Sequence, residues 1–351
     1  MSTLKATFLQ QAASTNPNIT LDGSANATVG GTLAMGSSFK RNKLINGSMN
    51  VYQRGSVAAT TSGAYTLDRW FVTPTGATVT VTQSTATVPT NFTASLNVAG
   101  AASVTNVSAY QRIESLNCQE LTSGSKVTVS GYIYQSTGSA VTTATVALVT
   151  PTASDNYAST TSAATTYTIP SFASATWTYF SNTFTLTTGC TNGLQLTIAL
   201  GTGLTTGSFN LTGVQLEVGS VATPYERQIY SEQLAQCQRY YYRNTQSAGG
   251  FAIATSGFNI STTQFYGYNT FPVTMRTNPT SIETTGTAAD YRIYSGGTAT
   301  ACSAVPSFDG SSVYHCQYIA VASGLTNGYG GNLLSKSGSG SSVYLAWSAE
   351  L

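Results

Sequence analysis

Apolar and polar residues alternate with a period of two along most of the chain, which is the pattern of half-buried β-strands. Between residues 65 and 218 the alternating segments are separated by turn residues, and no helical period intervenes. Many short strands at near-regular spacing predict a two-sheet sandwich with jelly-roll or Greek-key connections over residues 41–228. The predicted strands are residues 65–72, 77–83, 94–100, 107–113, 126–135, 143–149, 176–186, 194–200 and 208–218.

A second group of alternating segments predicts a smaller β domain over residues 244–351. Two Gly-rich segments inside it, residues 324–332 and 336–342, are expected to be loops, and neither precedes a helix as a phosphate-binding loop would. The fold class expected for the whole chain is therefore all-β. The predicted strands of this domain are residues 251–260, 263–271, 282–286, 291–296, 312–323 and 342–351.

Residues 1–40 form a separate leader with short alternating stretches around Gly-containing turns. Its strands are too short and too few to bury a core alone. We expect an extended attachment segment that completes its core with copies of itself or with a docking partner. The alternative is a flexible tail.

Residues 229–243 are the one segment with a helical period. Tyr230, Leu234, Cys237 and Tyr241 follow one another at spacings of four, three and four, which places them on one face of a helix. A helix of this length is marginal in water without packing partners. The stripe is expected to pack either on its own sandwich or on the same helix of sister subunits around a symmetry axis.

The composition narrows the class of partner. Only 7% of residues are charged and the net charge is +2, with no basic cluster, which argues against nucleic-acid binding. No run of apolar residues is long enough to span a membrane, and residues 1–11 have no apolar core of a signal peptide. We expect assembly in the cytoplasm of the cell that makes the protein, without membrane insertion.

The residues that usually perform catalysis or bind metals are sparse. The five cysteines are an odd number without CxxC spacing, so free buried thiols are expected. A single histidine, His315, gives no zinc pattern, and no GxSxG nucleophile motif occurs. The spacing of the acidic residues gives no support for a glycosidase pair. We expect no cofactor and no enzymatic activity.

Two groups of residues are candidates for ligand binding. Asp68 heads the segment Asp68–Arg69–Trp70 and is a candidate calcium ligand; the alternative is a structural role, in which Trp70 enters the core and Asp68 bonds backbone amides. Tyrosine side chains can pack against the C–H faces of sugars and also hydrogen-bond. The candidates for glycan contact are Tyr329, in a Gly-rich loop, and Tyr268 and Tyr266 in TQFYGYN.

Several longer motifs resemble one class of proteins. RNKLINGSMNVYQRG, followed by YTLDRW, resembles the opening of a carbohydrate-binding-module-like sandwich of bacteriophage tail fibres and other virion appendages. GVQLEVGSVATPYERQIYSEQLAQCQRYYYR resembles the closing strand of that module and the helix after it. FPVTMRTNPT and SAEL resemble the small C-terminal domain that often follows, and the leader resembles N-terminal attachment segments of such fibres.

The resemblance implies a structural virion protein, a homotrimeric tail fibre whose N-terminus binds other tail or baseplate proteins. Its C-terminal domain would be the distal tip, and the protein would attach the virion to surface polysaccharide of the host cell. The alternatives are a head fibre, a decoration protein or a baseplate protein without receptor binding, and a depolymerase tailspike. No long β-helix repeat of the usual tailspike kind is visible.

Overall fold

The computed structural model describes residues 40–170, 172–246, 253–336 and 343–351, together with the backbone of three short strands before residue 40. The chain divides into two compact units, Met1–Arg41 and Asn42–Leu351. In the first unit β1 (Phe8–Leu9), β2 (Ile19–Leu21) and β3 (Ala27–Val29) form a three-stranded antiparallel sheet. The rest of the predicted attachment segment, and the predicted loop 336–342 beyond Lys336, lie outside the described residues.

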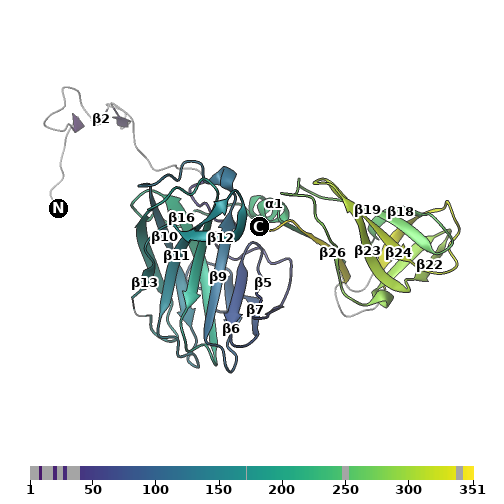
Figure 1. Ribbon diagram of the computed structural model, residues 1–351, viewed down its shortest axis with the longest axis horizontal. Coiled ribbons are helices and arrows are strands. Elements are labelled where there is room, and N and C mark those ends of the chain that lie inside the picture. The colour runs from purple at the N-terminus through teal and green to yellow at the C-terminus, as the bar shows by residue number, and fades with distance from the viewer. Residues whose placement is uncertain are drawn as a thin grey trace. The chain divides into compact units, whose positions relative to one another are not determined.

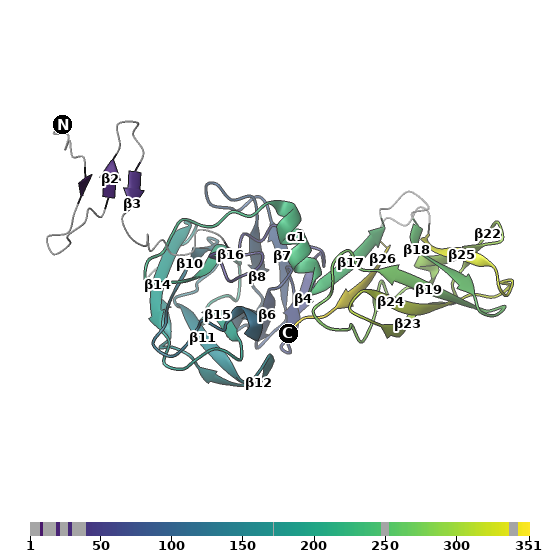
Figure 2. The ribbon, with the colours of Figure 1, turned by 90° about the horizontal axis from the view of Figure 1, so that it is seen from above.

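The second unit begins with a sandwich of two antiparallel sheets, which Figure 2 separates into two layers. In hydrogen-bonding order the first sheet contains β14 (Thr178–Thr185), β10 (Lys126–Gln135), β16 (Ser208–Val218), β8 (Ser95–Ala99), β7 (Val79–Ser84) and β4 (Val57–Ala59). The second contains β12 (Asn156–Ser162), β11 (Ala144–Ala153), β15 (Leu194–Leu200), β9 (Asn106–Ile113), β6 (Phe71–Thr75) and β5 (Ala64–Tyr65), with β13 (Tyr167–Ile169) paired to β11.

Successive strands cross from one sheet to the other: β8 is followed by β9, then β10, β11, β14, β15 and β16 on alternating layers, with the short β12 and β13 beside β11 (Figure 1). This confirms the predicted jelly-roll-like sandwich and the all-β fold class. Strict alternation of buried and less buried residues, as in β9 and β15, points one side of each strand into a single core. Trp70, Leu96 and Val129 are each at most 1% exposed there, and burial of such side chains contributes about 1.5–3 kcal/mol each.

Residues 241–351, here called the C-terminal lobe, form two further antiparallel sheets over a second apolar core. One sheet contains β17 (Tyr241–Gln246), β26 (Val343–Ser348) and β20 (Glu283–Thr284). The other contains, in order, β22 (Thr298–Ala301), β21 (Tyr291–Ser295), β25 (Gly330–Ser335), β18 (Ile253–Asn259), β19 (Gln264–Thr270), β24 (His315–Val321) and β23 (Ala304–Ser311). The described residues also contain two 3₁₀ turns, Ser115–Asn117 and Ala288–Asp290.

The prediction of one continuous strand over residues 65–72 is wrong, because a turn interrupts it. β5 ends at Tyr65 and β6 begins at Phe71, and a turn lies between them. Arg69 has a φ of 71°, in the left-handed region that a non-glycine residue rarely adopts. The turn is closed by hydrogen bonds from Thr66 N to Trp70 O (2.8 Å) and from Trp70 N to Leu67 O (2.8 Å).

The predicted helix at residues 229–243 is also shorter than expected. The helix α1 covers Tyr230–Gln238, and β17 starts three residues later. The tyrosine run joins a strand because residues 241–246 pair with β26 over six positions, and tyrosine favours strands. Tyr241 therefore does not share a helix face with Tyr230, Leu234 and Cys237.

The helix packs on its own sandwich. Its buried face carries Gln233 and Cys237, at a helical spacing of four. The Gln233 amide donates to the Ser48 hydroxyl (3.4 Å), and the Tyr240 hydroxyl just after the helix donates to Glu114 Oε1 (2.6 Å). The buried face of the helix therefore packs on the sandwich of its own chain, which is one of the two arrangements expected from the sequence.

The last residues of the sequence join the lobe to the sandwich. The Glu350 side chain is 4% exposed and forms ion pairs with Arg69 and, at 3.6 Å, with Arg54. Leu351 O accepts hydrogen bonds from the Tyr65 hydroxyl (2.7 Å) and from Arg112 Nη1 (2.6 Å). A buried charge cluster thus holds the two parts of this unit together.

All five cysteines are free and buried, as predicted from their number and spacing. Burial raises the pKa of the Cys118 and Cys302 thiols to about 12. Within the described residues, no helix has the length and apolar character needed to cross a bilayer.

Candidate glycan-binding cleft

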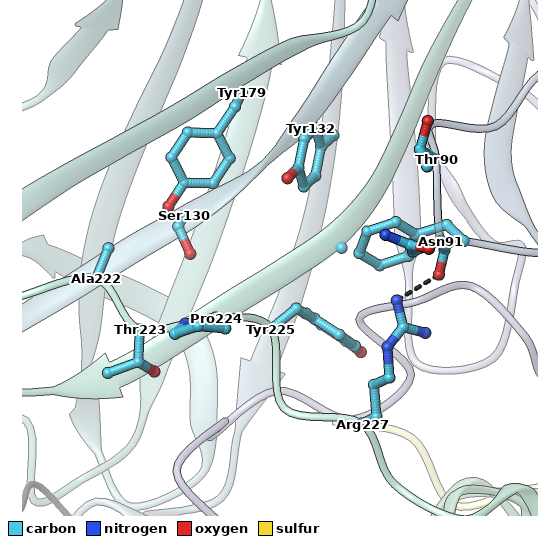
Figure 3. A pocket seen from close by; sticks show the side chains of 12 residues that line it. Thr90, Asn91, Ser130, Tyr132, Tyr179, Ala222, Thr223, Pro224, Tyr225 and Arg227 are labelled. Atoms are coloured by element: carbon cyan, nitrogen blue, oxygen red, sulfur yellow. Dashed lines mark hydrogen bonds between the residues drawn. The ribbon is translucent and has the colours of Figure 1, made fainter.

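A cleft of about 410 Å³ opens on the first sheet of the sandwich, over β10, β14 and β16. Tyr132 and Tyr179 line one side, and Tyr225 and Arg227 lie across from them (Figure 3). Tyr132 and Tyr179 are direct cross-strand partners of β10 and β14, with ring centroids 5.1 Å apart. Since such partners share a face of the sheet, the strand register itself places both rings in the cleft.

The rings form a continuous series. Phe92 lies 5.5 Å from Tyr132 and 5.3 Å from Tyr225, measured between ring centroids. The Arg227 guanidinium lies 5.0 Å from the Phe92 ring centroid and donates a hydrogen bond to Asn91 O. Tyr179, at one end of the series, is 48% exposed, so part of its side chain is accessible to a ligand.

A β-bulge with a glycine makes room for these rings. The pairing of β10 with β16 shifts between Ser130 and Tyr132, opposite Gly213. Gly213 has a φ of 62°, and a Cβ atom there would lie 2.6 Å from Phe92 Cζ. A bulge bends the strand and redirects its side chains, and here it lets Phe92 and Tyr132 approach the backbone of β16.

The wall opposite Tyr132 is a loop anchored by a buried carboxylate. Glu217 accepts hydrogen bonds from Thr223 N (2.8 Å), the Thr223 hydroxyl (2.7 Å) and the Gln215 amide (2.9 Å). Glu226 N in turn donates to Gln215 Oε1 (2.8 Å). Because β16 holds the loop at both ends of this network, Tyr225 is positioned before any ligand arrives, which lowers the entropic cost of binding.

The chemistry of the cleft is aromatic, hydroxylic and weakly charged. Thr90, Asn91, Ser130 and Thr223 add hydroxyl and amide groups between the rings, and Arg227 is the one charged residue among the twelve that line it. Burial raises the pKa of Tyr225 to about 12, so its hydroxyl stays protonated at neutral pH. Aromatic walls with a few placed polar groups suit a ligand with one apolar and one hydroxyl-bearing face.

Two more rings continue the aromatic surface along the same strands. Tyr134 of β10 lies two residues from Tyr132, on the same face, and its ring centroid is 5.4 Å from that of Trp177, which precedes β14, at an interplanar angle of 36°. Residues two apart in a strand are separated by roughly 6.6–6.8 Å. A linear ligand that lies along the strands would therefore meet a second ring pair next to the cleft.

The tyrosines predicted for glycan contact lie elsewhere, on the C-terminal lobe. Tyr266 and Tyr268 sit two residues apart on β19, with ring centroids 5.6 Å apart. Tyr329 is 53% exposed in the turn before β25, and its ring lies near Gly296. The structure thus brings Tyr266 and Tyr268 together and gives Tyr329 a separate position.

Asp68 has a structural role, which was the alternative to calcium binding. Its side chain is buried, and its carboxylate accepts hydrogen bonds from Gln53 N (2.7 Å) and the Gln53 amide. Trp70 is completely buried. The described residues contain no group of three or more His, Cys, Asp or Glu that could hold a metal ion.

The four residues predicted for oligomerisation separate into two sets. Cys237 is buried on the sandwich side of α1 and Tyr241 is buried in β17, where its ring stacks on Arg54 at 3.4 Å. Tyr230 is 56% exposed and Leu234 is half-buried. Only the latter pair is left for contact with another chain.

Comparison with known proteins gives likeness of fold alone. No protein-family model and no curated protein matches the chain. Solved structures that match include the enzymatically active domain of tailspike protein 4 of bacteriophage CBA120, at 15% identity and a TM-score of 0.35, over 51% of this chain and 22% of that one. The CBM22-1 xylan-binding domain from Paenibacillus barcinonensis matches at 14% identity and a TM-score of 0.30, over 52% of this chain and 96% of that one.

A third match is TmCBM61 in complex with β-1,4-galactotriose, at 12% identity and a TM-score of 0.29, over 51% of this chain and 99% of that one. The chain spans about a fifth of the tailspike structure and nearly all of the two binding modules. At identities and TM-scores this low, the likeness transfers neither a ligand nor an activity. The residues of the cleft, and not the fold, therefore indicate which ligand the protein can bind.

Proposed function

We propose that the protein binds glycans through the cleft of its sandwich and serves a bacteriophage as a tail fibre that attaches the virion to host surface polysaccharide. The observation that carries the proposal is the ring series Tyr179–Tyr132–Phe92–Tyr225, which is flanked by hydroxyl and amide groups and held in place by the Glu217 network. A sugar ring offers C–H faces to such rings and hydroxyls to the polar groups between them.

We propose binding without hydrolysis. Glycosidases of the common types place two carboxylates on either side of the scissile bond, whereas the twelve residues that line the cleft include no Asp or Glu. The carboxylates of Glu217 and Glu226, which hold the wall, accept hydrogen bonds from Thr223 N and Asn42 N. A depolymerase assay on host capsule or lipopolysaccharide tests this point, and release of oligosaccharides would contradict it.

The virion role and the trimer extend this proposal beyond the cleft. They are supported by the resemblance of the motifs to tail-fibre proteins and by the exposed apolar residues Tyr230 and Ile229 (70% exposed) at the start of α1. Residues 1–40 would bind other tail or baseplate proteins, and three chains would multiply weak glycan contacts through effective concentration. The particle would be assembled in the host cytoplasm.

Competition for adsorption tests the proposed role. Purified protein added to host cells should slow attachment of the phage, and a Tyr179→Ser variant should do so at least tenfold less well, since it removes the exposed ring of the cleft. A protein that neither binds host cells nor slows attachment would refute receptor binding. Immunogold label on the capsid in place of the tail would favour a head fibre or decoration protein.

A further inference from the structure

The seven-stranded sheet of the C-terminal lobe carries aromatic side chains on the face turned away from the lobe core. Phe258, Tyr268 and Tyr294 are 43%, 39% and 43% exposed, although they lie on three regular strands whose other face is buried. Tyr266 lies among them. We call these four residues the aromatic platform.

The strand register places the platform and its polar neighbours on one face. Ser256 of β18 pairs with Tyr268 of β19, and Tyr268 pairs with Gln317 of β24. In the other direction Ser256 pairs with Asn332 of β25, which pairs with Tyr294 of β21. Directly paired residues point to the same side of a sheet, so this row crosses five strands without changing face.

A second row brings two more rings beside the first. Phe258 pairs with Tyr266, and their ring centroids are 6.2 Å apart. The Tyr266 and Tyr268 rings are 5.6 Å apart at an interplanar angle of 73°. Three rings therefore form one compact group, and Tyr294 lies three strands from Tyr268, or roughly 14 Å at about 4.8 Å per strand.

Amide groups are fixed between the rings. The Ser256 hydroxyl donates to Asn332 Oδ1 (3.1 Å), and the Tyr266 hydroxyl lies 3.2 Å from Gln317 Oε1. The Ser256 bond holds the amide oxygen of Asn332, which leaves the NH₂ group of Asn332 as a donor on this face. Gln317 lies beside the Tyr266 hydroxyl, whose single proton is donated to Asp309. Vicinal sugar hydroxyls are acceptors for a donor such as the Asn332 NH₂ group.

The charge of the platform is nearly neutral. Asp309 is the carboxylate beside it and accepts a hydrogen bond from the Tyr266 hydroxyl. That bond raises the pKa of Tyr266 to about 12, so the phenol stays protonated. Arg292 lies two residues before Tyr294 on β21 and therefore on the same face. One carboxylate and one guanidinium thus flank the rings, and balanced charge favours a neutral ligand over an acidic one.

The exposed aromatic area of the platform is small compared with one side of a stable protein interface. An aromatic side chain has roughly 150–250 Å² of surface, so three rings about two-fifths exposed offer roughly 200–300 Å² together. A standard protein interface needs about 800 Å² from each partner. A patch of this size matches a ligand of a few sugar rings.

We propose that the aromatic platform is a second glycan-binding site, which takes a neutral hexose oligosaccharide lying across the strands with its ring faces on Tyr268 and Phe258. It rests on the proposed function only for the class of ligand, because none of its residues lines the cleft. With two sites per chain, each weak contact raises the effective concentration for the other.

The test uses the full chain and an array of neutral gluco-, manno-, galacto- and xylo-oligosaccharides. The platform variant is Phe258→Ser with Tyr268→Ser, and the cleft variant is Tyr132→Ser with Tyr179→Ser. Tyr314→Ser is the matched control, because Tyr314 is 63% exposed but precedes β24, outside the platform. We expect a set of oligosaccharides that the cleft variant and the control still bind and that the platform variant binds at least tenfold more weakly.

The outcomes separate the two sites. If the cleft variant loses every oligosaccharide that the unmodified chain binds and the platform variant loses none, the platform proposal is overturned and the cleft stands. If only the platform variant loses binding, the platform stands and the cleft proposal fails. A platform variant that binds every oligosaccharide normally but no longer self-associates in light scattering would reassign the face to contact between copies of the chain.

Discussion

The buried charge cluster at the end of the sequence gives the sharpest stability prediction. Glu350 faces two arginines, and the side chains of Glu350, Arg69 and Arg54 are 4%, 1% and 8% exposed. Glu350→Gln keeps the size of the side chain and one oxygen acceptor but removes its charge. Two guanidinium groups then remain in the interior without their shared carboxylate.

The expected loss of unfolding free energy depends on the contacts of the two arginines that stay buried. Removing one partner of a buried ion pair costs about 3–5 kcal/mol, because the other charge stays desolvated and unpaired. Arg69 keeps its stacking on Tyr240 (3.5 Å) and its bond to Arg112 O (2.6 Å), and Arg54 keeps its stacking on Tyr241 (3.4 Å). These contacts favour the lower end, about 3 kcal/mol of unfolding free energy.

Urea unfolding of the full chain, followed by tryptophan fluorescence, measures the effect. Trp70 reports on the sandwich core and Trp347 on the lobe core, and both are completely buried. With an m value of about 3 kcal/mol per molar urea, the midpoint should fall by about 1 M. The control is Glu120→Gln, because Glu120 is 48% exposed in its pair with Lys43 and such pairs contribute about 0–1 kcal/mol. Equal midpoints for the two variants would mean that the buried pair contributes no more than the exposed one, contrary to this prediction.

Three further predictions concern the cleft, the pH response and the assembly. Gly213→Ala should lower the unfolding free energy by about 2–5 kcal/mol, from left-handed strain and overpacking against Phe92, and should weaken glycan binding. Gly124→Ala is the control, because Gly124 has a φ of 84° but no neighbour within 4 Å and the variant should show the strain alone. Equal losses of unfolding free energy in the two variants would contradict the packing argument. Burial raises the pKa of Cys118 and Tyr225 to about 12. As the pH rises above about 9, the unfolded chain loses these protons before the folded protein does, so thermal stability should fall. A melting temperature that is flat from pH 9 to 11 would contradict this. Light scattering should give three times 36.5 kDa, and a monomer mass would refute the trimer.

Much of the sandwich could be predicted from alternation alone. Strands β10, β15 and β16 begin and end where the pattern placed them, because each has a continuous run of apolar residues on one side. The polar strand β12 has no apolar side, since most of its residues are exposed. It is a strand because it pairs with β11, and the alternation pattern did not predict it. The expected Gly-rich loop at residues 324–332 gives way to β25 at Gly330 for the same reason.

The cleft could not be predicted from sequence because five separate segments build it. Tyr132 and Tyr179 are 47 positions apart in the numbering and meet only through the register of β10 with β14. The signal that could have found them is the alternation within each strand, which places Tyr132 and Tyr134 on one face with Ser130. The bulge at Gly213 and the loop that carries Tyr225 have no comparable signal, since both depend on hydrogen bonds made after folding.

Titration of the full chain with oligosaccharides selected from the array measures whether the ring series of the sandwich cleft binds sugar. We expect Tyr179→Ser to weaken binding of at least one oligosaccharide tenfold or more. Its melting temperature should fall by only a few degrees, because Tyr179 is half exposed and loses about 0.2–1 kcal/mol of cross-strand packing on Tyr132. Unchanged affinity of Tyr179→Ser for every oligosaccharide that the unmodified chain binds would contradict sugar binding by the ring series.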